Sequence, residues 1–185
     1  MRIFISGGCK NGKSYYAQHL AKQQQNNNPL YYVATMKSSD KEDDERIARH
    51  IGEREGWGFT TIEQYHDIEN ILDVCNPNGS FLLDSLTALL ANEMFSDKRP
   101  YNFKNISKGL TKILDTISNI VIVSDYIYND GLIYEALTEE YRKGLANLDN
   151  LCTKHCDVVL EVSYTQIIAH KGVMVDALGK SVQSL

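Results

Sequence analysis

The sequence predicts an α/β fold, a mostly parallel sheet with helices packed on its faces. Short runs of apolar and β-branched residues alternate with longer segments of helical periodicity along the chain. The first apolar run leads directly into GGCKNGKS, a glycine-rich loop of the type that joins a strand to a helix. At 185 residues the chain is long enough for one domain with a full core and short for two. We therefore expect one α/β domain over residues 1–185.

The expected strands are short, and turn-forming residues separate them from the helices. They are Arg2–Ser6, Leu30–Thr35, Gly58–Gln64, Gly79–Asp84, Asn119–Ser124, Asp157–Val162 and Gln166–His170, the last of them at an edge of the sheet. The expected helices are Lys13–Gln25, Asp40–Glu53, Asp67–Val74, Ser85–Phe95, Phe103–Ser118 and Leu132–His155. The last helix is long enough to kink or divide, and Gly144 is the natural place. Residues 173–185 are expected to form a mobile tail.

Composition and charge argue against several classes of protein. The apolar fraction of 43% and the charged fraction of 23% are those of an ordinary globular protein. A net charge of -5 argues against a nucleic-acid surface, which needs a basic stripe. No run of ~20 apolar residues is present, so no membrane span is expected. The N-terminus opens with a strand and a loop in place of a signal peptide, so we expect a cytoplasmic protein with free thiols.

The loop Gly7–Ser14 matches G-x-x-x-x-G-K-[ST], the phosphate-binding pattern of P-loop NTPases. Its glycines let the backbone turn sharply, so that successive N–H groups point at phosphate oxygens where a helix begins. We expect Lys13 to contact the β- and γ-phosphates and the Ser14 hydroxyl to bind Mg²⁺. The alternative, an accidental glycine-rich turn, would not need the strand before it and the helix after it. The nucleotide-binding residues expected here are Gly7, Gly8, Cys9, Lys10, Asn11, Gly12, Lys13 and Ser14.

A carboxylate is expected beside this loop to hold the metal ion or its waters. Phe81, Leu82 and Leu83 form an apolar strand, and Asp84 follows where that strand should emerge. Asp84 is therefore expected to contribute to nucleotide binding and, with Ser14, to the Mg²⁺ site. The alternative is that Asp84 only caps the helix that follows.

The charged segment from Asp40 to Arg54 is the second informative stretch. In a helix, Arg46, His50 and Arg54 are four residues apart and lie on one face. The same pattern is typical of an ordinary solvated helix, which is the alternative interpretation. Neutral imidazole is a good nucleophile near pH 7, and neighbouring arginines neutralise a phosphate and keep the ring unprotonated. Together with the phosphate loop and Asp84, this histidine suggests nucleotidyl transfer as well as kinase chemistry.

These residues occur in an order that resembles one known family, the bifunctional adenosylcobinamide kinase / adenosylcobinamide-phosphate guanylyltransferase of cobalamin biosynthesis. The likeness extends over nearly the whole chain. Its most specific part is R-I-x-x-H-x-x-x-R, followed by a tryptophan and then a glutamate. The matching segments are GGCKNGKS, Tyr31–Thr35, Arg46–Arg54, Trp57, Glu63, Leu82–Thr87, Tyr141-Arg142, Cys156–Val158 and His170–Gly172.

The resemblance implies two reactions. Such enzymes phosphorylate the aminopropanol hydroxyl of adenosylcobinamide with a nucleoside triphosphate, ATP or GTP. They also take GMP from GTP onto a histidine, release pyrophosphate and pass the GMP to adenosylcobinamide phosphate. By position, His50 would be this nucleophile, and Lys13 would serve the phosphates.

The resemblance also implies further contacts with the nucleotide. It places against the nucleotide Thr35, Met36, Lys37, Ile51, Gly52, Glu53 and Arg54. It assigns Glu63 to the guanine, because a carboxylate accepts from the N1–H and the amino group of guanine together. It further implies a corrinoid substrate, an antiparallel edge strand and a trimer.

Two segments depart from the family's pattern. Asp125–Tyr128 stands in place of Asn-Glu-Val-Gly, which puts Tyr128 at a glycine position where its ring would fill ligand space. Ala146–Asp149 stands in place of Gly-Arg-x-Asn, so an expected arginine is missing. Two alternatives therefore stay open: a P-loop kinase for another small alcohol, with His50 a surface residue, and a GTP-binding paralogue without turnover.

Overall fold

The structure is a computed structural model that describes residues 1–172 except residues 39, 97–99, 129 and 165. The side chains of Arg46 and Glu53 lie outside this description. The tail expected at residues 173–185 lies outside the described residues as well.

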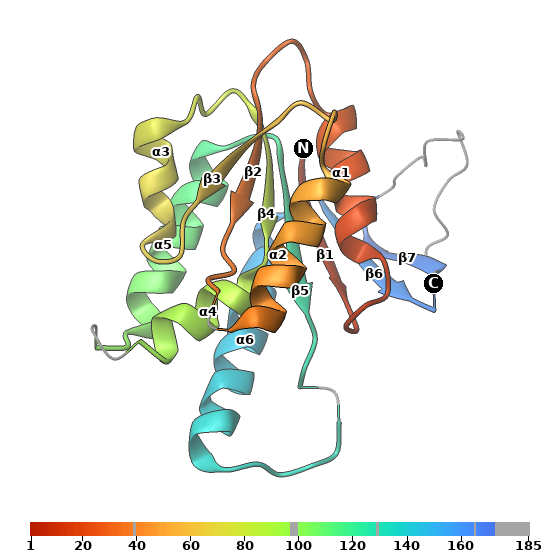
Figure 1. Ribbon diagram of the computed structural model, residues 1–185. Coiled ribbons are helices and arrows are strands. Elements are labelled where there is room, and N and C mark those ends of the chain that lie inside the picture. Colours follow the sequence, from red (N-terminus) through yellow and green to blue (C-terminus); the bar gives the residue numbers. More distant parts are fainter. Residues whose placement is uncertain (39, 97–99, 129, 165, 173–185) are drawn as a thin grey trace.

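Seven strands form one sheet in the order β3-β2-β4-β5-β1-β6-β7 (Figure 1). They are β1 (Arg2–Gly7), β2 (Leu30–Ala34), β3 (Phe59–Glu63), β4 (Ser80–Asp84), β5 (Ile120–Asp125), β6 (Val158–Ser163) and β7 (Gln166–Lys171). All neighbouring strands are parallel except β6 and β7, which pair antiparallel at one edge. The expected fold class, a mostly parallel sheet with an antiparallel edge strand near the C-terminus, is confirmed.

Each face of the sheet buries one apolar cluster, because successive residues of a strand point to opposite faces. Ile3 and Ile5 of β1 pack with Leu20 of α1 on one face, whereas Phe4 points to the other. The helices with core residues on the Phe4 face are α3 (Ile71–Val74), α4 (Leu86–Met94), α5 (Phe103–Thr116) and α6 (Ala136–His155). The remaining elements are α1 (Lys13–Gln23), α2 (Lys41–Glu53) and the short 3₁₀ helix η1 (Ile68–Asn70).

Helix α6 differs from the expectation in two ways. It begins at Ala136, four residues after the expected Leu132, and it continues through Gly144 without a break. Gly144 permits a close contact between helices, because a Cβ there would lie 3.2 Å from Leu90 of α4 and 3.3 Å from the Tyr101 hydroxyl. The glycine is therefore a packing residue, and the expected division of the helix at this position is wrong.

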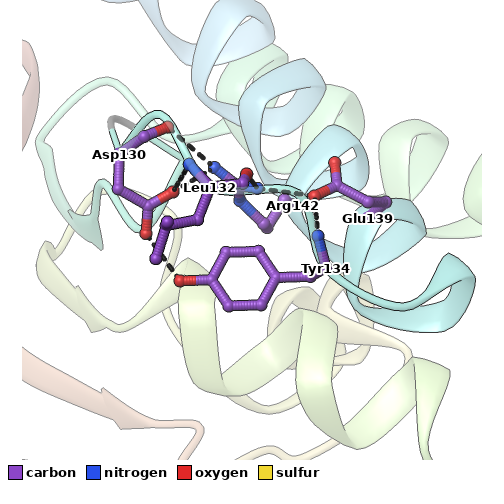
Figure 2. A network of polar contacts seen from close by, with 5 residues as sticks. All are labelled: Asp130, Leu132, Tyr134, Glu139 and Arg142. Carbon is purple, nitrogen blue, oxygen red and sulfur yellow. Dashed lines mark hydrogen bonds and ion pairs between the residues drawn. The ribbon is translucent and has the colours of Figure 1, made fainter.

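Arg142 holds the residues before α6 in a non-helical conformation (Figure 2). The Arg142 guanidinium donates to Asp130 Oδ1 at 2.7 Å, to Glu139 Oε1 at 2.6 Å and to the Leu132 carbonyl at 3.1 Å. Glu139 also accepts from the Tyr134 N–H at 3.1 Å, and the Tyr134 hydroxyl donates to Asp130 at 2.8 Å. These side chains satisfy backbone groups that an earlier helical turn would otherwise use, which explains the late start of α6.

All four cysteines are free, and Cys75, Cys152 and Cys156 are buried. Within the described part of the chain, no helix combines the length and the apolar character needed to cross a membrane.

Candidate functional site

The phosphate-loop sequence lies where its pattern predicts, between the end of β1 and the start of α1. Gly7 closes β1, and a Cβ at this residue would lie 2.5 Å from the Val162 carbonyl oxygen of β6, so only glycine fits there. Gly12 precedes α1 with a φ of 87°, the left-handed region that glycine adopts at little cost. The backbone therefore turns from strand to helix with its N–H groups at a helix N-terminus, which suits an anion.

Lys13 is buried at the base of this loop. Only 5% of the residue is exposed, and its ammonium donates to the Gly8 carbonyl at 2.9 Å. It also forms an ion pair with Asp125, the last residue of β5. Since β5 pairs with β1 and Asp125 stands opposite Gly7, the sheet itself brings this carboxylate to the loop.

Asp84 reaches the same region from β4. The Tyr32 hydroxyl donates to Asp84 Oδ2 at 2.9 Å, which orients the carboxylate. The next helix is capped by Ser85, whose hydroxyl accepts from the Ala88 N–H at 3.3 Å. The alternative role of Asp84 as the helix cap is therefore wrong. β4 is separated from β1 by β5, so Asp125, not Asp84, is the carboxylate on the strand adjacent to the loop.

His50 lies on α2, a helix with a strong start. The Asp40 side chain caps it by accepting from the Asp43 N–H at 2.9 Å, and acidic residues fill its first turn. His50 and its neighbour Arg49 both line the cavity described below. His50 therefore lines the same cavity as the phosphate loop. A residue on a helix face that meets only solvent would not line it.

Arg54 is one turn beyond His50, and its side chain is buried with 7% of the residue exposed. Its guanidinium lies over the Tyr32 ring, 3.6 Å from the centroid, and donates to the His50 carbonyl at 2.7 Å. Tyr32 in turn donates to Asp84. The chain of contacts His50–Arg54–Tyr32–Asp84 therefore links α2 to the carboxylate end of β4.

The phosphate loop and His50 open on one cavity of about 1180 Å³ at the carboxyl ends of the central strands. The expected site residues that line it are Cys9, Lys10, Asn11, Gly12, Lys13, Ser14, Met36, Lys37, His50 and Asp84. Ligands of open parallel sheets commonly bind at this edge. The cavity thus brings together the phosphate loop, the His50 side chain and the Asp84 carboxylate.

Other expected residues lie outside the lining of this cavity. Thr35 is fully buried, and its hydroxyl bonds to both the N–H and the carbonyl of Ser85 at 2.7 Å. Glu63 is exposed at the end of β3, an edge strand, where it accepts from the Tyr65 hydroxyl at 2.8 Å. The remaining expected residues without a place in the lining are Gly7, Gly8, Ile51, Gly52 and Arg54.

The cavity has a second wall that the sequence interpretation missed. It is formed by one face of α4 and the residue that follows this helix, together with Tyr141 of α6: Thr87, Ala88, Ala91, Asn92, Phe95 and Tyr141. The available signal was the i, i+3, i+4, i+7 spacing of Ala88, Ala91, Asn92 and Phe95, which places them on one helix face. Asp125 was also missed, although the apolar run Ile120–Val123 before it has the same pattern as the run before Asp84.

Of the two departures from the family's pattern, only Asp125 belongs to the cavity lining; residues 126–128 and 146–149 lie outside it. The Tyr128 ring packs against the core, and its hydroxyl donates to Asp149 Oδ2 at 2.7 Å. Burial raises the pKa of Asp149 to about 6, partly opposed by this hydrogen bond and reinforced by the nearby Asp125 charge. Asn147, at the position of the missing arginine, is exposed on α6. The space that Tyr128 fills therefore belongs to the packing beneath β5 and not to the cavity.

The donor groups in the cavity fit Mg²⁺. Ser14 and Asp84 supply a hydroxyl and a carboxylate, hard oxygen ligands of the kind Mg²⁺ takes together with substrate phosphates. Among the described residues, no group of three or more His, Cys, Asp or Glu side chains is gathered to hold a metal alone. A magnesium ion here would accordingly be bound jointly by the protein and the nucleotide.

Comparisons with known proteins agree with this picture. A family model described as cobinamide kinase / cobinamide phosphate guanyltransferase matches residues 3–168, nearly the whole chain. No protein of curated function matches the sequence. The matched range contains the phosphate loop, His50 and Asp84.

Solved structures resemble the fold at low sequence identity. PH0250 from Pyrococcus horikoshii OT3 has a TM-score of 0.51 at 9% identity, covering 99% of this chain and 91% of that one. The flagellar accessory protein FlaH from Methanocaldococcus jannaschii has a TM-score of 0.47 at 15% identity, covering 99% and 82%. The KaiC-like protein PH0186 from Pyrococcus horikoshii OT3 has a TM-score of 0.48 at 12% identity, covering 98% and 88%. At such identities the likeness concerns the fold alone.

Proposed function

Because this chain belongs to the cobinamide kinase / cobinamide phosphate guanyltransferase family, we propose that it carries out both reactions on a corrinoid substrate. In the first, it phosphorylates adenosylcobinamide. In the second, it transfers GMP from GTP to adenosylcobinamide phosphate through a guanylylated His50. The observation that carries the proposal is that the phosphate loop and His50 line the same cavity.

In the kinase step, the acceptor's hydroxyl oxygen attacks the γ-phosphorus of the bound triphosphate. A new P–O bond forms, the bond to the bridging oxygen breaks, the nucleoside diphosphate leaves and the hydroxyl proton passes to solvent. Lys13 and the loop N–H groups stabilise the charge on the phosphate oxygens. Ser14 and Asp84 would hold Mg²⁺, which when bound neutralises phosphate charge.

In the guanylyl step, a ring nitrogen of His50 attacks the α-phosphorus of GTP. An N–P bond forms, the bond to the pyrophosphate oxygen breaks and the ring loses a proton. A phosphate oxygen of the acceptor then attacks the same phosphorus, so that the N–P bond breaks and the imidazole regains a proton. Arg49 and Lys37 line the cavity with His50, and they supply positive charge for the phosphates in this step.

The test is incubation with GTP labelled on its α-phosphate and no acceptor. We expect protein-bound label that is released by acid and survives alkali, as a phosphoramidate does. His50→Ala should lose the label. His66→Ala is the matched control, because His66 lines the same cavity but is not assigned as nucleophile, and it should keep the label.

Other outcomes separate the alternatives. Phosphate transfer from ATP to an alcohol without this label would identify a kinase in which His50 is not a nucleophile. Tight GTP binding with neither label nor product would identify a nucleotide-binding protein without turnover. Label that persists in His50→Ala would overturn the assignment of the nucleophile.

A further inference from the structure

We propose that the wall formed by Ala88, Ala91, Phe95 and Tyr141 is the acceptor subsite, and that it packs against the methyl-bearing surface of the corrin ring of the acceptor alcohol. The inference rests on the proposed function for the identity of the acceptor. It adds the place where the acceptor binds, which the positions of the phosphate loop and His50 do not define. We call these four residues the acceptor wall.

The acceptor wall differs in chemistry from other parts of the cavity lining. The cationic lining residues Lys10, Lys13, Lys37 and Arg49 come from the phosphate loop, the segment after β2 and helix α2. The acceptor wall carries no charged side chain. The face of a helix that points away from the core is usually charged or polar, yet α4 presents Ala88 and Ala91 beside Thr87 and Asn92, and Phe95 follows the helix. Phe95 remains 51% exposed.

The polar groups along this wall are already used within the protein. The Tyr141 hydroxyl donates to the Thr87 carbonyl at 2.9 Å, and the Thr87 hydroxyl accepts from the Asp125 N–H at 2.9 Å. The Asn92 amide donates to the carbonyls of Thr35 at 2.6 Å and Tyr65 at 3.2 Å. The Ala88 and Ala91 methyl groups and the Phe95 and Tyr141 rings offer a ligand mainly apolar surface. Burial, with the nearby Asp125 charge, raises the pKa of Tyr141 to about 12, so this ring stays neutral.

The wall is also rigid. The other face of α4 carries Leu86, Leu89 and Leu90, all fully buried. The Phe95 and Tyr141 rings pack against each other with centroids 5.5 Å apart, so α4 and α6 meet along the wall. A preformed apolar surface can bind a ligand without first being ordered.

The cavity has room beyond that of a pocket for one drug-sized molecule, since its volume is about 1180 Å³ and such pockets run from about 300 to 1,000 Å³. An acceptor must approach the same phosphorus that the loop and His50 serve, so its reacting group must enter this cavity. The acceptor wall lines the same cavity but belongs neither to the loop nor to α2.

The test measures equilibrium binding of adenosylcobinamide by dialysis, followed by the visible absorbance of the corrin, and GTP binding in parallel. Phe95→Ala removes a ring from the wall, and Ala91→Leu fills space in front of it. We expect each to weaken adenosylcobinamide binding about tenfold. GTP binding and the labelling of His50 should stay within about twofold. Val74→Ala is the matched control, because Val74 is apolar and 70% exposed at the end of α3, outside the cavity lining.

Two results would overturn the acceptor wall. Unchanged adenosylcobinamide binding in both variants would show that the acceptor lies elsewhere. Loss of GTP binding in both variants, with adenosylcobinamide binding intact, would assign the wall to the nucleoside. Because binding is measured without turnover, these results are independent of the labelling of His50. Absence of adenosylcobinamide binding by the unaltered chain would overturn the proposed occupant, whatever the label shows.

Discussion

The two sides of the cavity that carry Lys13 and His50 are built in different ways. Lys13, Asp84 and Asp125 stand at the loop and at the ends of strands whose apolar residues are almost completely buried. His50 stands on α2, and no described side chain of that helix is classed with the buried core. The side formed by the strands is fixed by the core. Helix α2 is held by contacts at its C-terminal end, where the Arg54 guanidinium lies over the Tyr32 ring. Three residues further along the chain, the Trp57 ring packs against the His19 ring.

In the proposed mechanism, the residues that bind the phosphates and the helix that positions His50 would therefore be held in place by separate contacts. A change at the loop should remove the chemistry while α2 stays in position. A change at the Arg54–Tyr32 contact should misplace His50 while phosphate binding continues.

The largest expected effect is at Lys13. Lys13→Ala removes the ammonium that meets the phosphates and leaves Asp125 without its ion-pair partner. We expect phosphate transfer and His50 labelling to fall by about 10³-fold or more. Lys22→Ala is the control, because Lys22 is exposed in the last turn of the same helix and outside the cavity lining. Unchanged turnover in Lys13→Ala would remove the phosphate loop from the mechanism.

The next effect concerns Arg54. Arg54→Met retains apolar bulk but loses the hydrogen bond to the His50 carbonyl and the stacked guanidinium. We expect His50 labelling to slow by about 10²-fold, since small misplacements of a reacting group have that size, with GTP affinity nearly unchanged. Arg54→Lys keeps the charge without the planar group and should restore little.

Arg49→Met provides the contrast to Arg54→Met. Arg49 lines the cavity, so its loss should weaken GTP binding as well as labelling. If Arg54→Met weakens GTP binding as strongly as Arg49→Met, Arg54 binds nucleotide directly and the positioning role is wrong.

A smaller effect is expected at Tyr32. Tyr32→Phe keeps the ring beneath Arg54 but removes the hydroxyl that orients Asp84. Groups that orient a metal ligand commonly change metal affinity by about 10-fold or more, so the Mg²⁺ concentration for half-maximal activity should rise by about tenfold. Tyr31→Phe is the control on the same strand, because its hydroxyl accepts from the Asn76 N–H outside the cavity. An unchanged Mg²⁺ requirement in Tyr32→Phe would separate Asp84 from the metal.

The smallest effect on activity, and a measurable one on stability, concerns Asp149 behind β5. Its pKa is raised by burial from 3.8 to about 6, so the folded chain binds a proton that the unfolded chain has already lost between these values. Stability is therefore lost as the pH rises from 3.8 to about 6, by about 3 kcal/mol in all for a shift of this size, of which about 1.4 kcal/mol lies above pH 5.

Asp149→Asn should flatten this dependence. Urea unfolding at pH 5 and at pH 7.5 gives the comparison, with the exposed Asp115→Asn on α5 as the control. An equal loss of stability with rising pH in the two variants would contradict the assignment to Asp149. His50 labelling should be retained in both, because neither residue lines the cavity.

Local sequence signals were enough for the strands and for the phosphate loop. Each strand is a short apolar run, and the loop is defined by glycines whose backbone requirements are strict, such as Gly12 with its positive φ. The start of α6 was not predictable in this way. It depends on Arg142 reaching back to Asp130, and contacts of that kind follow from the folded chain and not from local periodicity.

The site was predicted less completely than the fold for a similar reason. Motif spacing identified Lys13, His50 and Asp84, which line one cavity. It did not identify Asp125, because only the order of strands shows that β5 lies next to β1. It also grouped Arg54 with the nucleotide, since spacing on one helix face does not tell whether a side chain turns toward a ligand or toward a tyrosine of the sheet.

The ion pair between Lys13 and Asp125 has a consequence for the empty protein. A lysine with so little exposed surface would be costly to keep charged in isolation, and the carboxylate removes that cost before any substrate arrives. An incoming triphosphate does not meet a bare cation. The phosphates must replace the Asp125 carboxylate as the ionic partner of Lys13. The nucleotide affinity therefore reports the free-energy difference between the Lys13–phosphate and Lys13–Asp125 ion pairs, and not the energy of the phosphate contact alone.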